Sequence, residues 1–386
     1  MKRFIIIATG CICVLLNGCI TEYTATGINE VENILVVEGL ITEGESTITL
    51  SKSTRLTNIP PGAVVYVNDA RVYVECDDGT QIQADQINAE PGTPDGKYML
   101  RIDNLHFERK YRLKIQLEEK GINASNQKVE YCSEYMYPNK TPEIDSVFFS
   151  KAGYRQPVII HVATRSKDEN LLYFRWSFTE EWEIHSTLSS FDPYIYPYYC
   201  WGKTKSQDLL IGSAQQTDAG RLTDRITEVL PASSKLRILY RIRVTQYALS
   251  KRAYEYFSNI KKNVQQTGDL FTPIPSELRG NITCTTYPER PVIGYVEIST
   301  STRNQLYLDW SDDVYEYSTP LFSCSGGIPE YRIDALVADG YFTREELVPY
   351  LWGYDEQGVF GLLYIRDRCI DCRLFGTTDR PDDWPE

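Results

Sequence analysis

The chain has 386 residues, with 53 acidic and 40 basic side chains and a formal net charge of -13. Hydrophobic residues make up 42% of it, which is too many for a disordered protein, and the length is enough for two or three domains. The acidic balance and the absence of any run of Lys and Arg argue against nucleic acid as a partner. With only three histidines, few imidazoles remain for metal binding or general-base catalysis.

The first eighteen residues have the pattern of a signal peptide. Lys2 and Arg3 precede an apolar run, Phe4 to Leu16, which is shorter than the roughly twenty residues needed to span a bilayer. The ending Leu16-Asn-Gly-Cys19 resembles a bacterial lipobox, which implies cleavage before Cys19 and acylation of that cysteine. The alternative is a plain secretory signal in which Cys19 is incidental.

Cleavage would leave residues 19–32 as a polar tether and 38 basic against 53 acidic residues, a net charge of -15. An acidic body gains nothing from anionic lipid, so the membrane would be a partner only through the acyl anchor at Cys19. Several acyl chains on one residue give effectively stable attachment. Because Ile20, not Asp, follows the cysteine, the sequence favours the outer membrane.

Seven cysteines follow Cys19, at positions 76, 132, 200, 284, 324, 369 and 372. In an exported chain such cysteines favour disulfides, although an odd number leaves at least one thiol unpaired. Cys369 and Cys372 have redox spacing but follow a strand-like run, Val359 to Ile365, instead of opening a helix. We expect Cys324 to pair with Cys369 or Cys372, and keep free thiols and a metal or redox site as alternatives.

Short strands with turns between them dominate the mature sequence. In Tyr111 to Leu117, apolar and polar residues alternate, and Asp77-Asp-Gly-Thr80 and Asn68-Asp69 both have hairpin chemistry. The sequence predicts a mainly β fold with two β-sandwiches, one immunoglobulin- or prealbumin-like over 33–137 and one fibronectin-like over 143–386. A proline-containing linker, Tyr137 to Pro142, separates them.

Two helical segments interrupt the second domain. Ser250 is a good N-cap for an amphipathic helix over about 250–266, with Ala253, Phe257 and Ile260 on its apolar face. A helical excursion is predicted over about 330–352, where Thr343 and Glu346 fit a capping box. Between them, Val292 to Ser299 and Gln305 to Trp310 are predicted to return as strands of the second domain.

The segment Phe191 to Trp201 is the most suggestive local feature. Two prolines hold five aromatic residues, which are Tyr194, Tyr196, Tyr198, Tyr199 and Trp201. Tyr and Trp offer flat faces with polar edges, as at protein interfaces and sugar platforms, so these residues are candidates for ligand or partner recognition. The alternative is that the aromatics simply pack against the second sandwich.

No motif indicates an active site. The sequence lacks a zinc-type His-Glu-x-x-His, a Gly-x-Ser-x-Gly elbow and the Gly-rich loops that bind nucleotides, and no regular oxygen-ligand spacing suggests calcium. Acids such as Glu180 and Glu181 are interpreted as surface acids. We therefore name no catalytic residue, no cofactor and no metal site, and keep a hydrolase as a remote alternative.

An ordered series of landmarks resembles the domain-of-unknown-function 4249 family over nearly the whole mature chain. The landmarks are Ile34–Gly39, Pro142–Ser146, Tyr173–Trp176 with Glu181–Trp182, Tyr199–Trp201, Ile211–Ser213, Gln246–Glu255, Gly280–Ile282, Pro291–Tyr295 and Asp371–Arg373. The resemblance implies an outer-membrane lipoprotein of Bacteroidota, of a kind often encoded beside TonB-dependent transporters. It supplies no catalytic residues. Only Glu22 follows Cys19 where surface lipoproteins of that phylum often carry an acidic cluster, so the membrane face stays open.

The expected function is that of a non-catalytic binding or accessory component of a TonB-dependent nutrient transporter, which would be its partner. The alternatives are a structural or adhesive envelope lipoprotein without a transport role, and a surface hydrolase acting on glycans or peptides.

Overall fold

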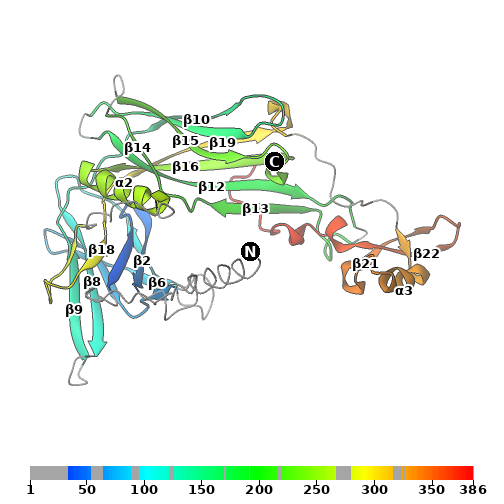
Figure 1. Ribbon diagram of the computed structural model, residues 1–386, viewed down its shortest axis with the longest axis horizontal. Helices are drawn as coiled ribbons and strands as arrows, with labels where there is room; N and C mark the ends of the chain where they lie inside the picture. The colour runs from blue at the N-terminus through cyan, green and yellow to red at the C-terminus, as the bar shows by residue number, and fades with distance from the viewer. Residues whose placement is uncertain are drawn as a thin grey trace, which may run out of the picture.

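The computed structural model describes residues 34–53, 64–87, 95–120, 126–168, 171–190, 192–215, 220–266, 280–315, 324 and 327–385. The predicted signal peptide, Cys19 and the tether lie outside these residues. The described chain is mainly β, in five sheets, with two α-helices. Figure 1 shows two sandwiches, joined near helix α2, and a smaller lobe that projects from the second sandwich.

Two sheets form the first sandwich. One has the order β18-β1-β2-β7-β6, with β3 also paired to β2, and the other has the order β17-β9-β8-β4-β5. The strands of the first sheet are β1 (Leu35–Gly39), β2 (Gly44–Lys52), β3 (Val65–Tyr66), β6 (Asp85–Ile87), β7 (Lys97–Ile102) and β18 (Val292–Gly294). Those of the second are β4 (Arg71–Cys76), β5 (Gln81–Gln83), β8 (Tyr111–Lys120), β9 (Asn126–Ser133) and β17 (Ile282–Cys284).

Alternation along the strands places the first core between these sheets. In β8, Tyr111, Leu113, Ile115 and Leu117 are all buried, which confirms the face predicted from the sequence. The Asp77–Thr80 hairpin is present as β4–β5. The Asn68–Asp69 hairpin is wrong, because β3 pairs with β2 in one sheet while β4 joins the other.

The first sandwich is completed by residues that lie far downstream. β18 pairs in parallel with β1, matching Leu35 to Val292, and β17 pairs with β9, matching Cys284 to Tyr131. Val296 and Ile298 belong to the same core. Assigning all of 143–386 to the second domain is therefore wrong for this segment, because its backbone completes the edges of both N-terminal sheets.

The second sandwich packs a three-stranded sheet, β10-β11-β15, against a larger sheet, β13-β12-β16-β19, with β14 also paired to β12. Its strands are β10 (Ile144–Lys151), β11 (Val158–Arg165), β12 (Tyr173–His185), β13 (Tyr199–Lys205), β14 (Leu210–Ser213), β15 (Arg221–Val229), β16 (Leu239–Leu249) and β19 (Ser301–Asp309). Short 3-10 turns η2 (Ser234–Leu236) and η3 (Trp310–Asp312) follow β15 and β19. Trp176 on β12 is the largest buried side chain of this core.

Helix α2 (Lys251–Gln266) lies at the junction of the sandwiches, close to its predicted bounds. The Ser250 hydroxyl accepts a hydrogen bond from the Ala253 amide at 3.2 Å, as an N-cap does. Phe257 packs against Tyr295 of the returning segment, with ring centroids 6.3 Å apart. Nearby, Glu297 accepts hydrogen bonds from the Ser250 amide at 3.1 Å and from its hydroxyl at 2.6 Å.

The lobe contains β20 (Ile328–Pro329), α3 (Glu330–Ala338), the turn η4 (Arg344–Glu346), β21 (Leu347–Tyr354) and β22 (Phe360–Arg366). The predicted helical excursion over 330–352 is thus wrong after residue 346, because β21 pairs along its length with β22. Thr343 makes no side-chain capping bond, so the predicted capping box is absent. Turns η5 (Asp367–Cys369) and η6 (Cys372–Leu374) lead out of the lobe.

Candidate binding sites

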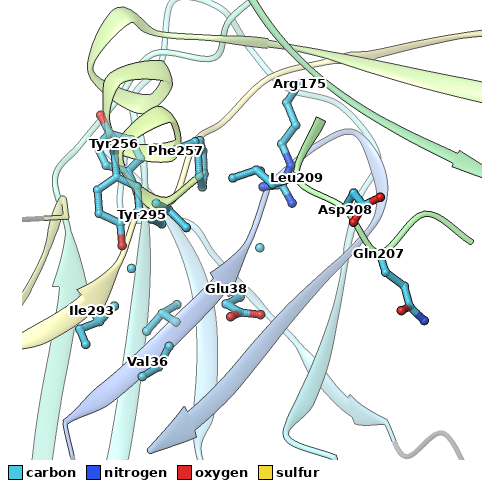
Figure 2. A pocket seen from close by; sticks show the side chains of 14 residues that line it. Val36, Glu38, Arg175, Gln207, Asp208, Leu209, Tyr256, Phe257, Ile293 and Tyr295 are labelled. Carbon is cyan, nitrogen blue, oxygen red and sulfur yellow. The ribbon is translucent and has the colours of Figure 1, made fainter. Parts of the chain in front are cut away.

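A cavity of about 280 Å³ lies where the two sandwiches meet (Figure 2). The first sandwich contributes β1 and β18, and the second contributes β12, α2 and the segment 207–209. Apolar side chains line most of it, among them Val36, Leu209, Phe257 and Ile293. Burial raises the pKa of Tyr256 and of Tyr295, so both phenols at this cavity stay neutral.

Arg175 is the cation of this cavity. It extends from β12 and its guanidinium lies 5.1 Å from the centre of the Phe257 ring. Burial lowers the pKa of Arg175 and outweighs the attraction of Glu38, and the guanidinium has no hydrogen bond or ion pair to any residue that the structure describes. An arginine has five N–H donors, so the Arg175 guanidinium can donate hydrogen bonds to a carboxylate or another acceptor that enters the cavity.

Two carboxylates border the same cavity. Glu38 extends from β1 and Asp208 from the segment between β13 and β14, and both are exposed. In Figure 2 they reach the cavity from different elements than Arg175 does. The sequence predicts none of these three as a site residue, although a lone arginine inside the aromatic run Tyr173–Trp176 is a usable signal.

The five aromatic residues predicted for recognition do not form one platform. Tyr194 is 96% exposed, whereas Tyr196 packs against the small core that contains Ile365 and Cys369. Tyr198 and Tyr199 make an edge contact with centroids 4.9 Å apart, and both rings lie beside His185. Packing therefore holds for Tyr196, and recognition by the exposed Tyr194 stays a prediction.

Trp201, the fifth of these residues, lies on β13 beneath the C-terminal segment. Its backbone exchanges hydrogen bonds with Thr377 at 2.7 and 2.9 Å. Its indole nitrogen is buried and has no hydrogen-bond partner among the described residues. With Lys203, Arg243 and Asp379, it borders an open cleft of about 720 Å³.

Two buried carboxylates on the same sheet, unlike Arg175, are bound by oppositely charged side chains. Glu180 and Glu181 are buried, not surface acids as predicted. Glu180 accepts hydrogen bonds from Lys235 at 2.7 Å and Tyr240 at 2.8 Å. Glu181 is bound by Arg241 through two nitrogens, at 2.9 and 2.6 Å. Burial opposes the ionisation of Glu181, but these hydrogen bonds and positive charges outweigh it and hold its pKa below the usual value.

Two disulfides fix the base of the lobe. Cys324, before the lobe, is joined to Cys369, after it, and Cys372 is joined to Cys200 on β13. The first pairing is one of the two expected from the sequence. The second was not foreseen, because strand position alone does not reveal what lies beside Cys200. The three free thiols of the described chain, Cys76, Cys132 and Cys284, are buried in or against the first sandwich.

One face of the lobe sheet is exposed and aromatic. Trp352 and Tyr354 of β21 are 67% and 72% exposed, and Phe360 of β22 is 59% exposed. Phe360 stacks with Trp352 at 6.2 Å and contacts Tyr354 at 5.1 Å between ring centroids. On the opposite face Leu363 and Ile365 are buried, and α3 lies beside β22. We call Trp352, Tyr354 and Phe360 the lobe face. Alternate aromatics along Tyr350–Tyr354 were an available signal for it.

The described residues contain no group of three or more His, Cys, Asp or Glu side chains arranged to hold a metal ion. They also contain no helix that is long and apolar enough to cross a membrane.

Comparisons with known proteins identify the family. No curated protein was found to match the chain. Among solved structures, the Enterococcus faecalis MSCRAMM ACE, described as binding its ligands by the collagen hug model, aligns with 58% of this chain and 90% of its own at 6% identity. The TM-score of 0.13 is too low for that likeness to carry an argument. Residues 20–305 match the model of the domain of unknown function 4249, so the chain belongs to the DUF4249 family, as its landmarks predicted.

Proposed function

We propose that this protein is an outer-membrane lipoprotein, anchored through Cys19, that serves as a non-catalytic accessory component of a TonB-dependent nutrient transporter. The signal-peptide and lipobox pattern supports the anchor. The lobe face, exposed on a projecting module, is the observation that carries the partnership.

The lobe face has the composition of a binding surface. Trp, Tyr and Phe are enriched at protein interfaces, and Trp and Tyr dominate their energetic centres. Phe360 contacts both Trp352 and Tyr354, and a contiguous exposed apolar patch of this kind is typical of a protein interaction site. The two disulfides at the base of the lobe restrict its movement, so little conformational entropy is lost when it docks.

Anchoring raises the effective concentration of the lobe near an integral membrane partner. A protein confined to the membrane plane meets a barrel in the same membrane far more often than a free protein does. A modest lobe interface would then be enough for stable association, and no catalytic group is required.

The test is co-purification of the native, lipidated chain from outer membranes in mild detergent. We expect a stoichiometric TonB-dependent barrel with the native chain, and at least a tenfold loss of that barrel when Trp352, Tyr354 and Phe360 are all changed to Ser. The matched control is Trp310→Ser, because Trp310 is 81% exposed but lies on η3, outside the lobe. A second variant, Cys19→Ala, is expected to move the protein out of the membrane fraction.

Retention of the barrel by a folded triple variant would refute docking through the lobe. Reproducible absence of any barrel from the native preparation would favour the structural or adhesive alternative. Turnover of a glycan or peptide that is lost on changing one carboxylate would replace the proposal with a hydrolase.

A further inference from the structure

We propose that the cavity between the sandwiches is a binding site for a small zwitterion with an apolar side chain, of the α-amino-acid type. Arg175 would hold its carboxylate, Glu38 and Asp208 would face its ammonium group, and Phe257 would pack against its side chain. The inference adds a ligand to the accessory role, but binding is a property of this chain alone and does not depend on a transporter.

Arg175 is a largely buried charge with no hydrogen-bonded counter-charge among the described residues. Burying a charge is costly unless a partner compensates it, and Arg pairs best with planar carboxylates through two parallel hydrogen bonds. Strand β12 itself provides the contrast, since Glu181, six residues along, has two arginines within 2.9 Å. Arg175 has no hydrogen-bond or ion-pair partner among the described residues; Glu38 attracts it only from a distance, and its guanidinium lies over the Phe257 ring. A ligand carboxylate would supply what the protein does not.

The two acids decide between an anion and a zwitterion. A simple anion bound to Arg175 would also feel repulsion from Glu38 and Asp208, which border the same cavity. A simple cation would be repelled by Arg175. A ligand with one charge of each sign, separated by a short distance, gains from all three residues, and mismatched charges in such a space are a source of specificity.

The volume and the apolar lining of the cavity limit the size of the ligand and favour an apolar side chain. The volume of about 280 Å³ lies just below the range of roughly 300 to 1,000 Å³ that is usual for drug-sized ligands, so one small molecule fits. Phe257 and Leu209 come from the second sandwich, and Ile293 comes from the returning segment of the first. An apolar side chain of the ligand would therefore contact both sandwiches at once.

Calorimetry on the full chain in mild detergent tests the inference, with L-phenylalanine, L-leucine and L-methionine as probes. We expect at least one of them to bind. Its amide, which lacks the carboxylate, and its N-acetyl form, which lacks the ammonium, should each bind at least tenfold more weakly. Loss of a charge-assisted hydrogen bond by Arg175→Gln is expected to weaken binding about tenfold to a hundredfold. Glu38→Gln and Asp208→Asn, at exposed positions, should each weaken it about twofold to fivefold.

The matched control is Arg303→Gln, because Arg303 is an exposed arginine on strand β19 of the same sheet and does not line the cavity. It should leave affinity unchanged. Arg175 makes no described hydrogen bond or ion pair that its removal would break, and it loses only its contact with Phe257, so Arg175→Gln should melt close to the native temperature. Absence of binding by all three amino acids, unchanged affinity in a folded Arg175→Gln chain, or tighter binding of the N-acetyl form would each overturn the inference. Barrel co-purification by the same variant would be unaffected, which separates failure of this inference from failure of the accessory role.

Discussion

Replacing Arg241 by Met should destabilise the second sandwich and release the C-terminal segment. Arg241 is fully buried on β16, and its guanidinium binds Glu181 on β12. The same group donates to the carbonyl oxygens of Asp382 and Asp383, both at 3.1 Å, and to the Tyr307 hydroxyl at 3.2 Å. One side chain therefore joins three strands and the end of the chain.

The expected loss of stability depends on the partners that Glu181 keeps when Arg241 is replaced. Removing one partner of a buried ion pair costs about 3 to 5 kcal/mol, because the other charge stays buried. Here Arg243 still donates to both oxygens of Glu181 at 2.9 Å, and Lys203 lies 3.3 Å away. We therefore expect the lower end, about 3 kcal/mol, for Arg241→Met. The partly exposed Arg243 provides the control, and Arg243→Met should cost about 1 kcal/mol or less.

Denaturant unfolding at pH 7 measures both variants, and limited proteolysis after residue 376 reports release of the C-terminal segment. The pKa of Glu181 is lowered in the folded protein, so its contribution is present above the unfolded pKa of about 4.3 and is lost as the pH falls through the folded pKa. The difference between native and Arg241→Met stability should shrink accordingly in acid. A cost below that of Arg243→Met, or a difference that grows in acid, would refute this account.

Three further predictions concern the lobe, the junction and the free thiols. Changing Cys324 and Cys369 together to Ser removes the cross-link across 45 positions, so the lobe should lose about 4 kcal/mol of unfolding free energy. Hydrogen exchange should become faster in 327–366 only, and unchanged exchange there would contradict this. Burial raises the pKa of Glu297, so its contribution to stability is present below about pH 4.3 and is lost as the pH rises through the raised pKa. Glu297→Gln should therefore flatten the stability profile between pH 4 and 8, and parallel profiles would show that Glu297 does not titrate there. Finally, Cys76, Cys132 and Cys284 should resist a maleimide in the folded chain and react in denaturant; rapid labelling of the folded chain would mean that the first sandwich opens.

The sequence predicts local structure correctly where residues a few positions apart along the chain determine it. The β8 alternation and the α2 N-cap at Ser250 depend on residues within a few positions, and both are present. The Asp77–Thr80 turn joins its two strands in the same way. The family could be identified from the order of such landmarks.

Contacts between segments that are distant in the chain could not be predicted from the sequence. Nothing near Val292 shows that it pairs with Leu35, and nothing near Cys200 shows that Cys372 lies beside it. The sequence predicts helix over much of β21 because Thr343 and Glu346 have capping spacing, whereas pairing with β22 determines the conformation of this strand. The sequence does not predict the cavity for the same reason, since Arg175 and Glu38 line a common space only after the two sandwiches are assembled.

For the exported lipoprotein that we propose, the return of residues 282–298 to the first sandwich sets an order on folding during export. A chain that crosses the inner membrane from its N-terminus delivers β1 and β9 long before β18 and β17, which complete their sheets. Until the later strands arrive, both N-terminal sheets have open edges, the kind of surface that pairs wrongly with other chains. Much of the second sandwich is delivered in that interval, so the first domain to leave the membrane is among the last to close. Any factor that protects this protein in transit would be needed for the first 290 or so residues, not merely for the first domain.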